Sequence, residues 1–297
     1  MTADRTMPSP EVDRRRGVLT LSCRDVPGIV HAVAGYLLEQ DCTIVESRQF
    51  EEPVSGTFFM RVEFARADGA GLEVDDVAAG FAVLADRFSM SWRLQDAARR
   101  QRVVLMVSRF GHCLNDLLYR NSIGDLRLEV VAVVSNHPDL ERLARAHDVP
   151  FLHVPVTAET KPAAEAHLLD LVDQEAVDLV VLARYMQVLS DEACKRLDGR
   201  AINIHHSMLP SFKGARPYQQ AHARGVKLIG ATAHYVTADL DEGPIIEQET
   251  LRVDHSMGPD QLAALGREAE SLALARAVRW HCENRVLLNG SRTVVFR

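Results

Sequence analysis

The sequence predicts an α/β protein of two consecutive domains, and three observations support this prediction. The chain has 297 residues, more than a single hydrophobic core usually holds. Its first third alternates strand-like and helix-like segments in the order βαββαβ. The remainder repeats apolar strands separated by helices, which is typical of a mainly parallel sheet. We therefore expect a disordered tail at 1–16, a first domain at 17–96, a linker at 97–101 and a second domain at 102–297.

The first domain has the pattern of a ferredoxin-like βαββαβ fold. Its first strand-like run ends at the turn signal Asp25-Val26-Pro27-Gly28, and apolar residues at helical spacing follow. Two β-rich runs then flank a segment containing Pro53 and Gly56, which predicts a hairpin. The expected elements are strands at 18–22, 43–50, 57–64 and 89–94 and helices at 29–40 and 71–85.

The second domain has the pattern of a Rossmann-like fold with a mainly parallel sheet. Such sheets bind their ligands beyond the carboxyl ends of the strands. The run that ends at His205 therefore leads into an expected binding site. The expected strands are 103–107, 128–135, 151–154, 178–182, 200–205, 231–236 and 245–253, and the expected helices are 113–119, 138–146, 162–174 and 259–284.

Composition excludes several classes of partner. Acidic residues outnumber basic ones by 41 to 34, and the net charge of −7 argues against a nucleic acid. The 5 cysteines are scattered without a C-x-x-C spacing, which fits a reducing cytoplasm better than a disulfide framework or a zinc site. No segment approaches the length of a membrane span. We expect a cytoplasmic protein that binds neither nucleic acid nor membranes.

Asn203, His205 and Asp241 are the candidate catalytic residues. In an extended segment, Asn203 and His205 point to one side while Ile202 and Ile204 point to the other. An amide can donate to a developing oxyanion, an imidazole can exchange protons near neutral pH, and a carboxylate can hold that imidazole cationic or act as a base. The alternative is structural: a turn asparagine, a buried histidine and an ordinary turn aspartate.

The neighbouring polar residues have more open roles. His206 should face away from His205 in an extended chain, so we assign it a structural role. His234 can steady the Asp241 carboxylate or simply be a buried, hydrogen-bonded histidine. Lys213 and Arg216, in the following loop, can meet an anionic substrate tail or remain solvated.

The second domain contains the motifs Asn203-x-His205-x-Ser207-x-Leu209-Pro210, Gly230-Ala231-Thr232, His234 and Asp241-x-Gly243-Pro244. With these motifs, residues 102 to 285 resemble the folate-dependent formyltransferase family. The resemblance implies that Asn203, His205 and Asp241 are catalytic and that His234 and Gly243 support them. The family has a histidine where Gln219 stands, so the role of that position stays open. The implied folate contacts, largely through backbone hydrogen bonds, are Met186, Gln187, Leu189, Val236, Thr237, Asp239 and Leu240.

The first domain resembles an ACT domain, through its βαββαβ order and its entry by Asp25, Pro27 and Gly28 into the first helix. ACT domains usually pair across a subunit interface, which implies a homodimer or homotetramer. The resemblance also implies an amino-acid effector at that interface. A purely structural role in dimerisation is the alternative.

Three features indicate which formyl acceptor the resemblance implies. The segment 108–114 has a single glycine and a bulky Arg109-Phe110 pair, where nucleotide-synthesising members have a glycine-rich phosphate loop. The chain lacks residues for the C-terminal domain of tRNA-formylating members, and an ACT-like domain is typical of members that use water. The implied reaction is hydrolysis of 10-formyltetrahydrofolate to formate and tetrahydrofolate, in one-carbon and purine metabolism.

In that reaction folate is the substrate, and neither a cofactor nor a metal is needed, since no histidine pair has a metal-ligand spacing such as H-x-x-x-H. Two alternatives remain from the sequence. One is formyl transfer to a small amine, and the other is a non-catalytic folate or amino-acid sensor.

Overall fold

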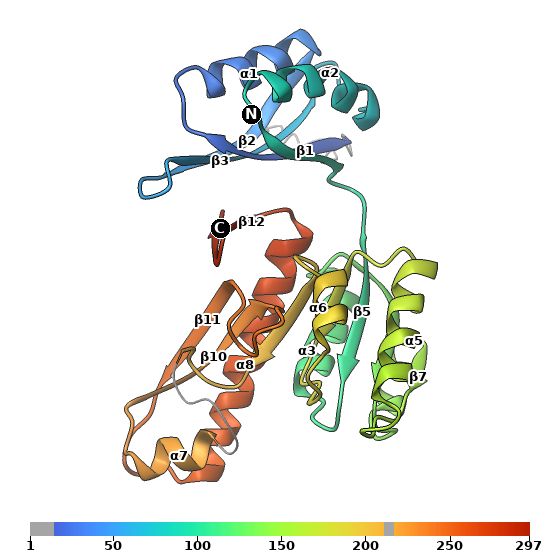
Figure 1. The fold of residues 1–297 in the computed structure, drawn as a ribbon, viewed down its shortest axis with the longest axis vertical. Coiled ribbons are helices and arrows are strands. Elements are labelled where there is room, and N and C mark those ends of the chain that lie inside the picture. The colour runs from blue at the N-terminus through green and yellow to red at the C-terminus, as the bar shows by residue number, and fades with distance from the viewer. Residues whose placement is uncertain (1–14, 211–216) are drawn as a thin grey trace, which may run out of the picture. The chain divides into compact units, whose positions relative to one another are not determined.

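A computed structural model describes residues 15–210 and 217–297 (Figure 1). The chain divides between Arg99 and Arg100 into two compact units. Most of the predicted tail lies outside the described residues, but Arg16 is not part of a tail, because it begins strand β1 and pairs with Ala65. Gln101 likewise belongs to a strand rather than to the predicted linker, because it pairs with Leu128.

The first unit is a four-stranded antiparallel sheet with two helices. The strand order is β2-β3-β1-β4, and the elements follow the predicted βαββαβ sequence. Gly28 begins the first helix at φ 98°, a left-handed conformation that favours glycine. The elements are β1 (Arg16–Arg24), α1 (Ile29–Glu39), β2 (Cys42–Glu52), β3 (Thr57–Arg66), α2 (Val74–Arg87) and β4 (Ser91–Asp96).

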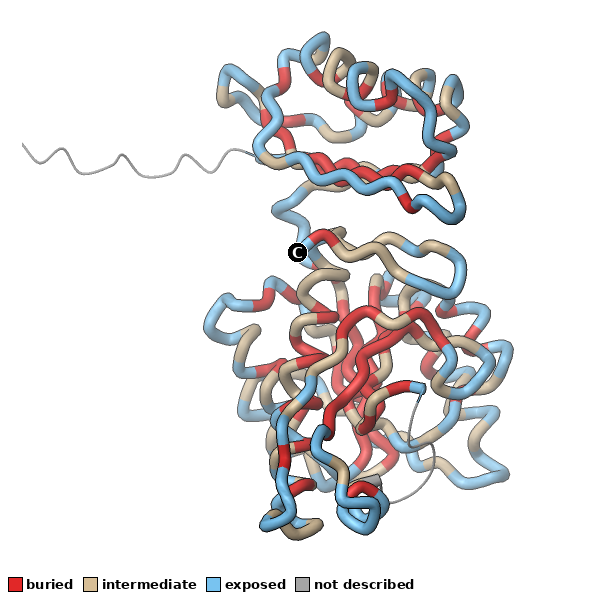
Figure 2. Tube along the Cα trace, turned by 90° about the vertical axis from the view of Figure 1, so that its left-hand side faces the viewer, coloured by how far each residue is buried: buried red, intermediate tan, exposed pale blue. Residues whose placement is uncertain are grey.

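One face of this sheet and the two helices form the core of the first unit. Helix α1 buries Ile29, Val33 and Leu37 at helical spacing, and α2 buries Phe81 in the same way. Alternate residues of β1 and β3 complete this core. Figure 2 shows buried stretches along the strands of this sheet. The apolar residues that recur every 3.6 positions in the helices and every second position in the strands therefore pack together in this core.

The second unit is built on a seven-stranded sheet in the order β11-β10-β9-β8-β5-β6-β7. The strands from β9 to β7 are parallel, and β10 and β11 are antiparallel, so the mainly parallel sheet is confirmed. The elements up to the last parallel strand are β5 (Gln101–Val107), α3 (His112–Ser122), β6 (Leu128–Ser135), α4 (Glu141–Arg145), β7 (Phe151–His153), α5 (Lys161–Gln174), β8 (Leu179–Leu182), α6 (Asp191–Arg196) and β9 (Ala201–His205). The rest are α7 (Pro217–Ala223), β10 (Leu228–Tyr235), β11 (Ile245–Arg252), α8 (Pro259–Cys282), β12 (Val286–Asn289) and β13 (Arg292–Val295).

Helices cover both faces of this sheet. On one face, α3 and α8 pack their apolar residues against β5, β8, β9 and β10. On the other face, α5 and α6 pack against β5, β6 and β8. The central strands are therefore buried on both sides, which is why they read as continuous apolar runs. Within the described residues, no helix is long and apolar enough to cross a membrane.

Four short elements of the second unit were not predicted from the sequence. Helices α6 and α7 and the hairpin of β12 and β13 are too short to show a clear periodicity. A signal for α6 is nevertheless present, because Ser190 caps it by accepting a hydrogen bond from the Ala193 amide, and Asp191 and Glu192 follow.

Candidate active site

Strands β9 and β10 bring the candidate residues together at the carboxyl end of β9. Their antiparallel register places His234 opposite Asn203 and Thr232 opposite His205. Ile202 and Ile204 point into the hydrophobic core on the opposite side of β9. The predicted alternation along this strand is therefore confirmed, and two polar side chains of β9 share one face with two of β10.

Asp241 reaches this group from the turn that follows β10. Its backbone is left-handed at φ 58°, a conformation that aspartate tolerates better than most residues. The turn returns the chain to β10, where the Tyr235 amide donates to the Pro244 carbonyl at 2.9 Å. Gly243 is required by packing, because a Cβ atom there would overlap the Tyr235 carbonyl. The close turn fixes where the carboxylate can point.

His205 lies between a carboxylate and a hydroxyl. Its Nδ1 is 3.2 Å from Asp241 Oδ2, and its Nε2 is 2.8 Å from Ser207 Oγ. Both side chains of the His205–Asp241 pair are largely buried, at 7% and 14% exposure. The hydrogen bond from His205, followed by the contact with His234, holds the pKa of Asp241 well below its usual range. The carboxylate therefore stays ionised and orients the imidazole.

His234 orients the amide of Asn203. His234 Nδ1 donates to the Tyr235 carbonyl at 2.8 Å, because a carbonyl oxygen only accepts. With Nδ1 as the donor, Nε2 accepts a hydrogen bond from Asn203 Nδ2 at 3.2 Å. The second amide hydrogen of Asn203 is then available for a substrate carbonyl. His234 Nε2 also lies 3.6 Å from Asp241 Oδ1, so one histidine contacts both the amide and the carboxylate.

The predicted orientation of His206 is wrong. Its ring lies 5.1 Å from the ring of His205, because β9 ends at His205 and the alternation of an extended strand no longer applies. Burial, followed by the nearby cation Arg184, lowers the pKa of His206 to about 4. A neutral imidazole therefore packs beside His205 at neutral pH.

A second hydrogen-bonded group, which was not predicted from the sequence, holds the loop after β9. Thr232 Oγ1 donates to the Ser207 carbonyl at 2.9 Å and accepts from the Leu209 amide at 3.1 Å. Gln248, on β11, donates to the Leu209 carbonyl at 3.1 Å. The sequence shows Thr232 only as part of a motif, because its hydrogen-bond partners are distant in the sequence and could not be predicted. This group fixes the loop that carries Ser207 against His205.

The segments expected to contact folate share one hydrophobic cluster. Leu189 is buried in it, and Tyr185 and Val236 pack against it. Gln187 and Leu189 also line a small cavity whose other side is formed by α5. Met186 and Leu240 are more accessible, with 53% and 61% of their surface exposed. Thr237 and Asp239 lie in one turn, in which Thr237 Oγ1 donates to the Asp239 carbonyl at 3.0 Å.

The next residues are those that were predicted to bind an anionic substrate tail, together with Gln219. Lys213 and Arg216 lie outside the described residues. Gln219 is exposed on α7.

Comparisons with known proteins agree with this geometry. The formyl transferase family model matches residues 101–278, and the chain belongs to this family. A curated formyltetrahydrofolate deformylase from Corynebacterium sp. (strain P-1) is 54% identical over 282 residues, covering 95% of this chain and 98% of the relative.

Solved structures differ in how much of this chain they match. A crystal structure of formyltetrahydrofolate deformylase from Burkholderia mallei matches with a TM-score of 0.91 and 54% identity, over 95% of this chain and 100% of that chain. The glycinamide ribonucleotide transformylase 1 of Symbiobacterium toebii matches with a TM-score of 0.63 and 33% identity, over 67% of this chain and 95% of that chain. The deformylases therefore match both units, whereas the transformylase matches a part of about the size of the second unit.

Proposed function

We propose that this protein hydrolyses 10-formyltetrahydrofolate to formate and tetrahydrofolate. The observation that carries the proposal is the joint geometry of Asn203, His205 and Asp241 in a chain that matches deformylases over nearly its whole length. Water attacks the formyl carbon, the bond from that carbon to N10 breaks, and N10 gains a proton. The products are one carboxylate and one secondary amine.

Each candidate residue has a defined task in this reaction. The free amide hydrogen of Asn203 donates to the formyl oxygen as negative charge develops on it. The His205–Asp241 pair accepts the proton of the attacking water and returns a proton to N10. His234 is a positioning residue that holds the Asn203 amide in the donating orientation.

We propose that the folate ring lies against the cluster formed by the two segments at 185–189 and 236–240. The buried Leu189 and the adjacent Val236 support an apolar contact with a planar ring. Met186, Gln187, Thr237, Asp239 and Leu240 remain predicted contacts, largely through their backbones.

No cofactor or metal is part of the proposed reaction. Folate is the substrate, and Asn203 and His205 already supply the electrophilic assistance that a metal would otherwise give. All five cysteines are free thiols, which supports a reducing compartment, and we propose the cytoplasm.

We propose that the first unit is an ACT domain that pairs with a second copy of the chain. Its antiparallel sheet of order β2-β3-β1-β4 and its βαββαβ sequence support this assignment. The assignment carries the proposals of a homodimer or homotetramer and of an amino-acid effector at the interface between copies.

Formate release without an added amine tests the proposed function. Purified protein is incubated with 10-formyltetrahydrofolate, and tetrahydrofolate and formate are quantified together. Equal amounts of both products without an acceptor are expected. Release only after an amine is added would favour formyl transfer, and no release in either case would favour a non-catalytic sensor.

A further inference from the structure

The contacts of His205 determine which of its ring atoms can exchange a proton with the reacting groups. Its Nδ1 lies 3.2 Å from Asp241 Oδ2, and an ionised carboxylate only accepts hydrogen bonds, so Nδ1 donates. A proton taken up by the ring must therefore enter at Nε2. That atom lies 2.8 Å from Ser207 Oγ, so the serine hydroxyl occupies the position through which the proton enters.

Ser207 is suited to pass a proton, because a hydroxyl group both donates and accepts. When Nε2 of His205 is unprotonated, the Ser207 hydroxyl donates to it, and when Nε2 carries a proton, the same oxygen accepts. Contacts of 3.2 and 2.8 Å thus join the Asp241 carboxylate, the His205 imidazole and the Ser207 hydroxyl in one row. In such a row, an imidazole held by a carboxylate can withdraw the hydroxyl proton.

The backbone around Ser207 holds the hydroxyl in this position. Ser207 lies just beyond the end of β9 and is 5% exposed. Its carbonyl accepts from Thr232 Oγ1 at 2.9 Å, and the same Thr232 oxygen accepts from the Leu209 amide at 3.1 Å. Strand β10 therefore fixes the loop that carries the hydroxyl, so the contact with His205 is present before the reaction begins.

A cavity adjoins Ser207 and gives water access to it. The cavity has a volume of about 300 Å³, which leaves room for water beside its polar lining. Among the described residues, His206, Ser207 and Tyr218 supply the polar side chains of this lining, and the remainder comes from Met208, α7 and β10. A water molecule in this cavity can donate to the Ser207 oxygen while the Ser207 hydroxyl donates to His205.

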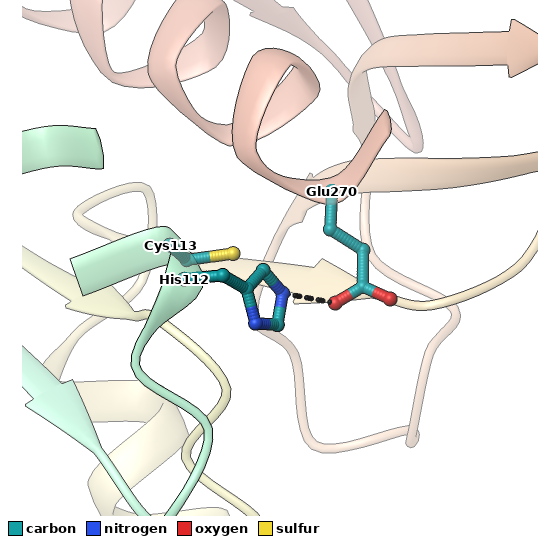
Figure 3. A group of neighbouring side chains, drawn as sticks. All are labelled: His112, Cys113 and Glu270. Atoms are coloured by element: carbon teal, nitrogen blue, oxygen red, sulfur yellow. Dashed lines mark hydrogen bonds and ion pairs between the residues drawn. The ribbon is translucent and has the colours of Figure 1, made fainter. Parts of the chain in front are cut away.

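The other two polar side chains among the described lining residues are poor proton carriers. Burial, followed by the nearby Glu270, raises the pKa of Tyr218, whose hydroxyl donates to Glu270 Oε1 at 2.7 Å. The other oxygen of Glu270 accepts from His112 Nε2 at 2.8 Å, so this carboxylate is engaged at both oxygens (Figure 3). Burial lowers the pKa of His206 to about 4, so its ring is a weak base at neutral pH. Ser207 therefore connects the cavity to the catalytic imidazole.

We propose that Ser207 is a catalytic residue that relays protons between the reacting groups and His205. The inference rests on the proposed function, in which water attacks the formyl carbon. As the water oxygen bonds to that carbon, the water gives one proton to Ser207 Oγ, and the Ser207 hydroxyl proton moves to His205 Nε2.

The second half of the reaction reverses these transfers. When the bond from the formyl carbon to N10 breaks, His205 returns its proton to Ser207, and the Ser207 hydroxyl gives a proton to N10. The formic acid then loses its remaining acidic proton to solvent. Ser207 ends the cycle unchanged, and its oxygen never bonds to carbon.

A proton inventory tests the relay directly. The rate of formate release in a single turnover is measured in mixtures of H₂O and D₂O for the wild type, Ser207→Ala and Ser207→Thr. Two protons move together in the relay, so the wild-type rate should follow a curve as the deuterium fraction rises, whereas the residual rate of Ser207→Ala should fall linearly. Ser207→Thr keeps the hydroxyl and should keep the curve.

The steady-state constants provide a second readout. General acid–base catalysis typically contributes about 10²–10⁴-fold, so kcat of Ser207→Ala should fall at least about 10²-fold with little change in KM. Ser122→Ala is the matched control, because the Ser122 hydroxyl donates to the Tyr119 carbonyl at 2.8 Å at the end of α3. This control should keep the rate and the curve of the wild type.

The outcomes separate this inference from the proposed function. A linear proton inventory in the wild type, which requires no variant, or a wild-type kcat in Ser207→Ala would overturn the relay. A formyl group found on Ser207 by mass spectrometry of the quenched protein would make the serine a nucleophile and would also overturn the relay. Absence of formate release from 10-formyltetrahydrofolate in the wild type would instead overturn the proposed function.

Discussion

Asn203 is the residue whose substitution should cost the most turnover with the least structural change. Loss of one oxyanion donor typically lowers turnover about 10²–10³-fold. We expect this loss in Asn203→Ala, measured as the initial rate of formate release. Asn203→Asp has nearly the same volume but no donor, so it should be impaired as strongly. A wild-type rate in Asn203→Asp would show that the amide donor is not used.

His206 should make the stability of the protein depend on pH. Burial, followed by the nearby Arg184 and His205, lowers its pKa from 6.5 to about 4 in the folded state, and Glu270 and Asp241 act in the opposite direction. Between these two values the unfolded chain binds a proton that the folded chain does not. The free energy of unfolding therefore falls as the pH decreases through this window.

Substitution of His206 should remove this part of the pH dependence. Urea unfolding at about pH 7 and about pH 5 should show a larger loss of stability in the wild type than in His206→Gln. His31→Gln, at an exposed histidine of α1, is the control and should behave as the wild type does. An identical loss in His206→Gln and the wild type would contradict the assigned pKa.

Single residues were predictable from the sequence where a local rule applied. The strand alternation placed Asn203 and His205 on one face, and the motif joined Asp241 to them. His206 was misplaced because the end of β9 cannot be located to one residue from a pattern. The contact between His112 and Glu270 was not predictable, because 158 positions separate the two residues and only the fold brings them together.

The turn between β10 and β11 is the element on which the geometry of Asp241 depends. In Gly243→Ala the new Cβ would overlap the Tyr235 carbonyl, so the turn must move and carry Asp241 with it. Overpacking of this kind typically costs about 1–3 kcal/mol of stability. We expect that loss in thermal or urea unfolding, together with a large loss of formate release.

A second glycine provides the control for this prediction. Gly35 lies within α1, and a Cβ atom there would meet nothing within 4 Å. Gly35→Ala should stabilise the protein by up to about 1 kcal/mol, since alanine favours the helix, and should leave formate release unchanged. If Gly243→Ala behaved like Gly35→Ala, the turn would not determine the position of Asp241.

Elements were predictable where hydrophobic periodicity was strong. Runs such as β5 and β6 are buried on both faces and stand out as apolar segments, and α8 shows a regular apolar stripe. Helices α6 and α7 and the hairpin of β12 and β13 are short, so their stability comes from packing rather than from a local pattern.

At the scale of the whole molecule, the fold gathers chemistry from distant segments at one edge of a sheet. The parallel strands direct their carboxyl ends to that edge, where Arg184 follows the end of β8 and His205 ends β9. The antiparallel β10 then adds His234 and the turn that holds Asp241. This arrangement follows from a topology that the sequence indicates, whereas the pairing of individual side chains follows from packing.

The central claim is that water accepts the formyl group, and turnover in H₂¹⁸O tests it most directly. The purified protein is incubated with 10-formyltetrahydrofolate in this solvent without an added amine, and the formate is analysed by mass spectrometry. Hydrolysis forms a new bond between the formyl carbon and solvent oxygen, so each formate should carry a single ¹⁸O atom, and Asn203→Ala should produce far less of it. Formate without ¹⁸O, or a formyl group recovered on an amine, would contradict the account.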